Sequence, residues 1–256
     1  MPMAEARNLT VIRSHATLLD DVSAGVGAGE IVGVVGPNGA GKTSLLRALA
    51  GDITPTSGSV RVAGRDPVAT PLAELSRIRA YLEPYQPSDV VFTVGEVVAM
   101  GRRPLRHTAL DSQEHDAVVA ASMADVDVGH LAERALSTLS TGERQRVGLA
   151  RILAQQASVM LLDEPTSALD VGHQEMVMGT LRRVARMGVA VVIAIHDLNL
   201  AAAHADRIAV LSEGRLSADG EPWDTLRADL LSEVYAQPMR VERHPTRSCP
   251  LVVVVD

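Results

Sequence analysis

Cysteine and aromatic residues are scarce in this sequence. Its 256 residues include one cysteine, one phenylalanine and one tryptophan, and aromatic residues make up 2% of the chain. Because Cys249 is the only cysteine, no internal disulfide and no cysteine-based metal site can form. The scarcity of aromatic rings also makes stacking platforms for single-stranded bases hard to build. The single cysteine also gives no indication of an oxidising compartment.

Long apolar runs are missing too, although hydrophobic residues make up 46% of the sequence. The longest, such as Val189 to Ile195 and Leu251 to Val255, contain only a handful of residues, whereas a membrane-spanning helix needs about 20. The first residues, MPMAEARNLT, lack the basic start and the apolar stretch of a secretory signal. We therefore expect a cytoplasmic protein, built as one large α/β domain or two small ones.

The sequence also has no excess of positive charge, since its formal net charge is −7. Affinity for duplex nucleic acid depends largely on clustered Lys and Arg side chains that neutralise phosphates. We therefore expect no nucleic-acid partner.

Short apolar, β-branched runs alternate with helical patterns, which is typical of a mostly parallel sheet covered by helices. Three of these runs end in polar clusters. Ile31 to Val35 precedes a glycine-rich turn, Val159 to Leu162 precedes two acids and a proline, and Val189 to Ile195 precedes His196. In open α/β sheets, ligands bind beyond the carboxyl ends of the strands. The three clusters therefore predict one site at that edge.

Residues 87–156 read as helix almost throughout. Apolar residues recur at helical spacing in Val94 to Met100 and in Val147 to Leu153. We predict a helical insert over 87–156, flanked by core segments at 1–86 and 157–240 and followed by a tail at 241–256. No internal repeat or low-complexity linker divides the sequence, so a single compact unit is the simplest interpretation.

The glycine-rich turn fits the phosphate-binding pattern G-x-x-x-x-G-K-[ST]. It reads Gly36-Pro37-Asn38-Gly39-Ala40-Gly41-Lys42-Thr43. Its backbone N–H groups can turn inward around phosphates, and the helix predicted from Ser44 to Ala50 presents its positive end to the same anion. We expect Lys42 to reach the β- and γ-phosphates and Thr43 to bind Mg²⁺. The loop alone indicates only a nucleoside triphosphate, because kinases, GTPases and many ATPases share it.

Two acids and a histidine follow the other two strands. Neighbouring side chains at a strand end point to opposite faces, so Asp163 and Glu164 can do different work. Asp163 suits the Mg²⁺ shell, and Glu164 suits holding and deprotonating the attacking water. His196 follows a strand at the same edge, where it can sense the γ-phosphate or orient the water.

A further segment opens a predicted helix and reads Leu139-Ser140-Thr141-Gly142-Glu143. Ser140 and Glu143 have the spacing of a capping box. The segment resembles the signature sequence of ATP-binding-cassette (ABC) ATPases, and the other motifs occur in the order of that family. Gly36 to Thr43 resembles the Walker A loop, Val159 to Glu164 the Walker B strand, and His196 the switch histidine. Ser167 to Asp170 resembles the D-loop.

The resemblance implies a P-loop NTPase (RecA-like) core, an antiparallel β subdomain near the amino terminus and an inserted helical subdomain. It also implies a head-to-tail homodimer, with each ATP between the Walker A loop of one copy and Ser140 and Gly142 of the other. Further implied nucleotide contacts come from Ser44, Glu143 and Asp170. The expected partners are an integral membrane permease and, indirectly, a substrate-binding protein, at the cytoplasmic face of the membrane.

Three positions depart from the family pattern. Thr141 stands where the signature usually has its first glycine. The adenine-stacking position, usually aromatic, falls near Arg13 and His15, and Arg13 can stack through its guanidinium plane. The Q-loop of the family usually reads Leu-Pro-Gln, whereas this sequence reads Leu82-Glu83-Pro84-Tyr85-Gln86. Gln86 is the predicted Mg²⁺ contact, and Glu83 is the alternative.

Two segments resemble the corresponding segments in the ATPases of importers for iron–siderophore complexes, haem and cobalamin. They are Phe92 to Pro104 and His196 to Leu200. A nearby basic cluster can face the permease or lipid headgroups, or be a solvated helix end. It consists of Arg102, Arg103, Arg106 and His107. The alternatives are an ABC ATPase for another substrate, a soluble ABC-type ATPase acting in translation or DNA repair, and a P-loop kinase or GTPase. The last would leave the signature segment unexplained.

Overall fold

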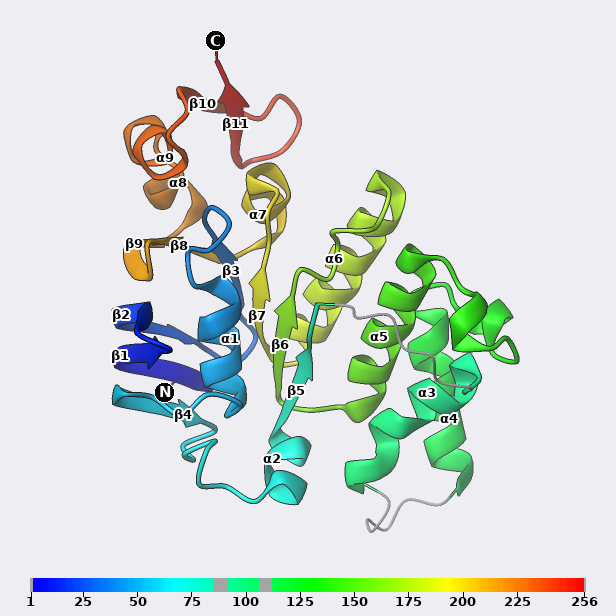
Figure 1. Cartoon of the computed structure of the whole chain (residues 1–256). Coiled ribbons are helices and arrows are strands. Elements are labelled where there is room, and N and C mark those ends of the chain that lie inside the picture. The colour runs from blue at the N-terminus through cyan, green and yellow to red at the C-terminus, as the bar shows by residue number, and fades with distance from the viewer. Residues whose placement is uncertain (1, 85–91, 106–111, 256) are drawn as a thin grey trace.

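A six-stranded sheet forms the centre of the protein (Figure 1). The computed structural model describes residues 2–84, 92–105 and 112–255. Five strands run parallel, and the sixth, β9, pairs antiparallel with β8. In spatial order they are β5 (Arg79–Leu82), β6 (Val159–Asp163), β7 (Ala190–Ala194), β3 (Ile31–Val35), β8 (Arg207–Ser212) and β9 (Arg215–Gly220). The predicted mostly parallel sheet is confirmed.

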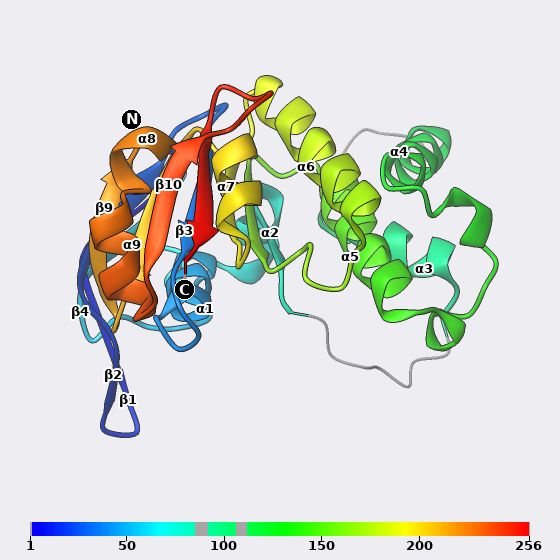
Figure 2. The ribbon, with the colours of Figure 1, turned by 90° about the horizontal axis from the view of Figure 1, so that it is seen from above.

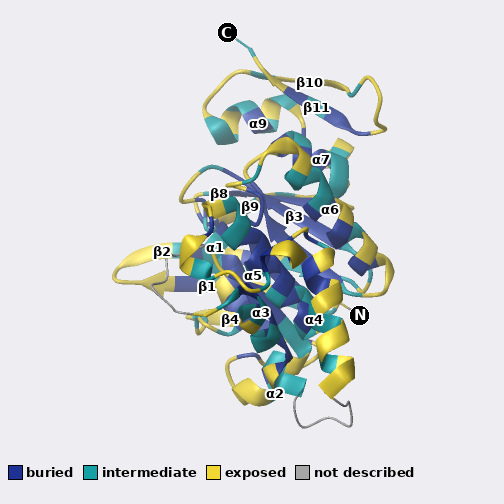
Figure 3. Cartoon of the chain, turned by 90° about the vertical axis from the view of Figure 1, so that its right-hand side faces the viewer, coloured by how far each residue is buried: buried dark blue, intermediate teal, exposed yellow. Residues whose placement is uncertain are grey.

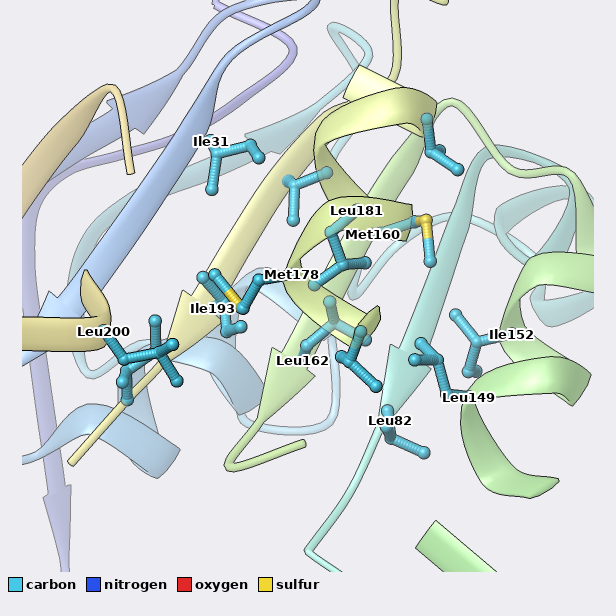
Figure 4. Packing of buried hydrophobic residues seen from close by; sticks show 14 of the residues in the cluster. Ile31, Leu82, Leu149, Ile152, Met160, Leu162, Met178, Leu181, Ile193 and Leu200 are labelled. Atoms are coloured by element: carbon cyan, nitrogen blue, oxygen red, sulfur yellow. The ribbon is translucent and has the colours of Figure 1, made fainter. Parts of the chain in front are cut away.

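Side chains of the central strands alternate between two hydrophobic layers. In β7, Val191 and Ile193 pack into the layer beneath α6 (Val171–Arg186) and α7 (Leu198–His204), whereas Val192 and Ala194 pack into the layer beneath α1 (Lys42–Ala50). Figure 4 shows the first layer, where Ile193 lies near Met178 and Leu162. Each of the strands β3, β6 and β7 has five residues, and all of them are buried, as expected of parallel strands covered on both faces.

A second, antiparallel sheet lies at the amino-terminal end of the chain and confirms the predicted β subdomain. Its spatial order is β2 (Ala16–Val26), β1 (Ala4–Arg13) and β4 (Ser57–Val62). The turn between β1 and β2 projects from the body of the molecule (Figure 2) and is exposed (Figure 3).

The helical insert lies beside the β5 edge of the sheet (Figure 1). It contains α3 (Val94–Ala99), the 3-10 segment η1 (Met100–Leu105), α4 (Ser112–Ala124) and α5 (Thr141–Gln155), with two short 3-10 turns at Gly129–Leu131 and Leu136–Thr138. A further helix, α2 (Leu72–Ile78), precedes β5. Capping boxes begin both α3, at Thr93, and α5, at Ser140. The capping box predicted from the spacing of Ser140 and Glu143 is therefore confirmed.

The carboxyl-terminal part consists of two short helices and a hairpin. They are α8 (Pro222–Thr225), α9 (Ala228–Tyr235), β10 (Met239–Arg243) and β11 (Pro250–Val254). The side chain of Asn199 on α7 donates to the carbonyl of Val252 at 3.1 Å and accepts from its N–H at 2.7 Å. This double contact holds the hairpin against the helix that follows His196.

The structure corrects the interpretation of one member of the basic cluster, Arg102. Arg102 is only 2% exposed, and its guanidinium donates to the carbonyl of Ala154 at 2.8 Å and to the side chain of Gln156 at 2.7 Å. It ties η1 to the end of α5 rather than facing a partner, because these two acceptors bind one nitrogen of a buried guanidinium. Arg103 is exposed, and residues 106 and 107 lie outside the described part. Within that part, no helix is long and apolar enough to span a bilayer.

Candidate functional site

The loop from Gly36 to Thr43 joins the end of β3 to α1 and surrounds the Lys42 ammonium. Lys42 is 5% exposed and donates to the carbonyls of Gly36 at 2.7 Å and Pro37 at 3.0 Å. Burial lowers the pKa of Lys42, and the nearby carboxylates of Glu164 and Asp163 act in the opposite direction. Gly41 precedes α1 without a side-chain cap, so the first N–H groups of the helix are available to an anion.

Two glycines of the loop are required by close contacts. Gly36 has φ +147°, and a Cβ there would lie 2.1 Å from the carbonyl oxygen of Leu211. Gly41 has φ +104°, and a Cβ there would lie 2.8 Å from the carbonyl oxygen of Leu18. A side chain at either position would meet backbone that cannot move aside cheaply.

Asp163 ends β6 with its carboxylate buried. The residue is 1% exposed. Among the described residues, no donor has both the distance and the angle of a hydrogen bond to either carboxylate oxygen. Burial raises the pKa of Asp163, whereas the Thr43 hydroxyl beside it lowers that pKa, as does Lys42. Burying a carboxylate is costly unless it is fully paired, and a hard cation would complete the pairing. The donor set of Asp163 and Thr43 therefore fits Mg²⁺.

The described residues contain no group of three or more His, Cys, Asp or Glu side chains that could hold a metal ion. Mg²⁺ commonly uses one or two protein carboxylates and completes its shell with water and phosphate oxygens.

Glu164 follows Asp163 in a backbone conformation that is unusual for a residue with a side chain. Its φ is +53°, which costs a non-glycine residue roughly 1–2 kcal/mol. Its N–H donates to the carbonyl of Ala194 at 3.1 Å, and its carboxylate contacts Nε2 of His196, the residue two positions after β7. The ends of β6 and β7 therefore bring Glu164 and His196 together, and the turn of the backbone aims the Glu164 side chain at that contact.

The signature segment forms the exposed amino-terminal tip of α5. The Ser140 hydroxyl accepts from the N–H of Glu143 at 3.3 Å, and the Glu143 carboxylate accepts from the N–H of Ser140 at 2.7 Å. Hydrogen bonds from the side chain and the N–H of Ser140 lower the pKa of Glu143. Ser140 is exposed, so this helix tip is accessible to a second molecule.

A cavity of about 230 Å³ lies over the loop and brings several of the predicted residues together. It is lined by Asn38 to Ser44 and by Glu164, together with Thr17 and Leu18 of β2. Thr17 and Leu18 were not predicted from the sequence, because their place depends on how β2 packs against the loop. The other described site residues that the sequence predicted lie outside this lining: Gly36, Pro37, Asp163 and His196, together with Arg13, Ser140, Gly142, Glu143 and Asp170. A larger cavity of about 540 Å³, between α7 and the residues before β11, contains none of the predicted site residues.

The predicted Q-loop residue Gln86 lies outside the described residues. The alternative, Glu83, follows β5, and the pairing of Leu82 with Leu162 places it beside Asp163 at the strand ends. Its exposed carboxylate pairs with Arg47 at 3.4 Å and raises the pKa of that guanidinium.

Asp170 and Arg13 lie away from the cavity lining. Asp170 caps α6, where its carboxylate accepts from the N–H of His173 at 2.9 Å. Arg13 is exposed at the end of β1, beside a turn in which Ser14 and His15 both have positive φ.

Comparisons with known proteins point to one family. The family model described as "ABC transporter" matches residues 19–167. The hemin import ATP-binding protein HmuV of Nocardia farcinica is 49% identical over 255 residues, which cover 98% of this chain and 88% of that protein. The protein of the same name from Streptomyces coelicolor is 48% identical over 251 residues, with 98% and 89% covered.

Solved structures give the same result. A chain from a metal-chelate type ABC transporter in an inward-facing conformation has a TM-score of 0.83 at 26% identity, with 100% of this chain and 98% of that chain covered. A dimeric bacterial ABC transporter cassette has a TM-score of 0.75 at 26% identity, with 86% and 98% covered. The family model spans more than half of the chain and the relatives match nearly all of it, so the chain belongs to the ATPases of the ABC transporter family.

Proposed function

We propose that the protein is the ATPase subunit of an importer for haem, and that it works as a head-to-tail homodimer on a separate membrane permease. The dimer is supported by the exposed tip of α5 at Ser140, which carries the signature segment outside the cavity that the chain's own loop forms. The first N–H groups of a helix form a phosphate site. The tip of one copy can therefore complete the nucleotide site of the other.

The division of work follows from the geometry of the site. The loop amides and Lys42 bind the β- and γ-phosphates, and the ammonium exchanges its present carbonyl partners for phosphate oxygens. Asp163 and Thr43 would hold Mg²⁺, which would neutralise phosphate charge when bound. Glu164 orients the attacking water and accepts its proton, and His196 fixes the position of the Glu164 carboxylate.

The observation that carries this proposal is the convergence of three groups at one sheet edge: the buried Lys42 ammonium, the buried carboxylate of Asp163 and the Glu164–His196 pair. Positioned acid–base groups contribute roughly 10²–10⁴-fold to rate. Glu164→Gln should therefore lower ATP turnover by about that factor while ATP binding persists, trapping an ATP-bound dimer on a sizing column. Lys42→Ala should abolish the nucleotide-dependent dimer, because the loop then lacks the ammonium that binds the β- and γ-phosphates.

A matched control is Glu133→Gln, which removes the charge of an exposed glutamate on the helical insert. It should leave turnover and dimerisation unchanged. Normal turnover by Glu164→Gln would exclude the proposed base, and dimerisation unaffected by Lys42→Ala would exclude the loop as the phosphate site.

Haem is favoured as the cargo because the relatives that the chain matches over nearly its whole length are named for hemin import. A source strain that carries Glu164→Gln should lose growth on hemin as sole iron source and keep growth on a ferric salt. Loss of growth on a ferric siderophore, or loss of cobalamin uptake, with intact growth on hemin would assign the importer to that cargo instead. The same relatives give no support to an ATPase acting in translation or DNA repair.

A further inference from the structure

Gln145 on α5 contacts the catalytic strand end from a different part of the fold. It lies in the second turn of the helix that begins at Ser140, and it is 7% exposed. Its side-chain amide donates to the backbone carbonyl of Glu164 at 2.5 Å and, at 3.4 Å, to the hydroxyl of Ser167. Its side-chain oxygen accepts from the N–H of Ala168 at 3.1 Å. One buried side chain thus joins the helical insert to the segment after β6.

The carbonyl that Gln145 contacts belongs to the residue with the strained backbone. Glu164 has φ +53°, and such a conformation persists only where the surroundings over-determine it. Its carbonyl also accepts from the N–H of Ser167 at 3.3 Å and from the Ser167 hydroxyl at 3.1 Å. Both of these donors lie in the same turn as Glu164. Among the described residues that donate to this carbonyl, Gln145 is the one from outside the turn, so it fixes the turn relative to α5.

Close packing at the tip of α5 supports the same connection. A Cβ at Gly142 would lie 2.9 Å from the carbonyl oxygen of Ala168. The first turn of α5 therefore rests directly on the residues whose backbone Gln145 contacts. A shift of α5 by about 1 Å along or away from the sheet would break these contacts, because hydrogen bonds weaken steeply outside a narrow range of distance and angle.

We propose that Gln145 is a positioning residue that aligns Glu164 when α5 is seated against the strand end. The inference rests on the proposed function, in which α5 presents Ser140 to the nucleotide of the second copy while Glu164 serves the nucleotide of its own chain. Under that arrangement, Gln145 links the contact made at one ATP site to the geometry of the base at the other.

The test compares variants of the isolated full chain by steady-state ATP hydrolysis. Gln145→Met keeps the length of the side chain and removes its hydrogen bonds. We expect kcat to fall by about 10- to 100-fold, the effect of a catalytic group misplaced by about 1 Å, while KM for ATP stays within about 2-fold, because the loop that binds the phosphates does not contact Gln145. Gln145→Glu keeps an acceptor for the N–H of Ala168 and loses the donor to Glu164, and it should give the same split.

Gln155 provides a matched control on the same helix. Its side-chain amide donates to the carbonyls of Ser76 at 2.6 Å and Arg79 at 2.8 Å, ten residues further along α5 and away from the catalytic turn. Gln155→Met should leave kcat within about 2-fold of the parent. An equal fall in kcat for Gln155→Met would overturn the proposal, since the effect would then reflect loosening of α5 as a whole.

The trapped dimer separates this inference from the proposed function. Gln145→Met combined with Glu164→Gln should still form the ATP-dependent dimer, because closure depends on Lys42 and Ser140. Loss of that dimer in the double variant alone would show that Gln145 orients the helix tip and not the base, which refutes the proposal. Unchanged kcat for Gln145→Met would refute it as well. Failure of Glu164→Gln by itself to dimerise would count against the proposed function.

Discussion

Substituting alanine for Gly41 tests whether contact with β2 or backbone conformation fixes the phosphate-binding loop. Gly41 has φ +104°, and a Cβ there would lie 2.8 Å from the carbonyl oxygen of Leu18 and 2.9 Å from Cδ2 of Leu19. A side chain in the left-handed region costs roughly 1–2 kcal/mol, and overpacking adds about 1–3 kcal/mol. We therefore expect Gly41→Ala to lower the free energy of unfolding by about 2–5 kcal/mol.

Gly39 supplies the control, because its φ is +80° and a Cβ there would meet nothing within 4 Å. Gly39→Ala should cost only the backbone penalty of roughly 1–2 kcal/mol. Each kcal/mol lowers Tm by about 2–4 °C in a chain of this size, so Gly41→Ala should melt about 2–12 °C below Gly39→Ala. Nucleotide-free protein is used, since a ligand would shift both values. Equal melting temperatures would show that the loop does not bear on β2 as described.

Two further predictions concern the buried acid and the tip of α5. Asp163→Asn should raise the Tm of the nucleotide-free protein at pH 7 while abolishing Mg²⁺-dependent hydrolysis. Burial raises the folded-state pKa of Asp163, so the wild-type chain gains stability as pH falls through that pKa. The Tm difference between Asp163→Asn and the wild-type chain should therefore shrink as the pH is lowered, and a Tm difference that grows would refute this. Thr93→Ala and Ser140→Ala each remove an N-cap hydroxyl from a capping box and should cost about 1 kcal/mol, measured by urea denaturation, but only Ser140→Ala should lower ATP turnover. Loss of turnover in both would make the Ser140 effect a matter of helix stability.

The sequence was sufficient for the parts of the site that depend on local patterns. The three strand ends, the glycine-rich loop and the capping box at Ser140 lie where periodicity and spacing predict them. These features depend on residues a few positions apart, and the chemistry of the backbone fixes them. The mostly parallel sheet follows from the alternation of strands and helices for the same reason.

Contacts between distant elements could not be predicted in this way. Gln145 meets the carbonyl of Glu164 nineteen positions away, and neither residue type signals the other. Thr17 and Leu18 line the cavity because β2 passes the loop, and Arg102 is buried because the end of α5 supplies its acceptors. Each depends on the final packing of elements, which periodicity along one element does not contain. Glu164 also lacks any residue-type signal for its positive φ.

The two carbonyls around the Lys42 ammonium affect how a nucleotide is received. Because the carbonyls of Gly36 and Pro37 already accept hydrogen bonds from this ammonium, the loop is preorganised. Arriving phosphates therefore replace these carbonyls as partners of Lys42 and do not have to order a flexible loop. Nucleotide binding then avoids most of the conformational entropy loss that ordering a flexible loop would cause. Its rate should depend on diffusion and charge more than on a folding step.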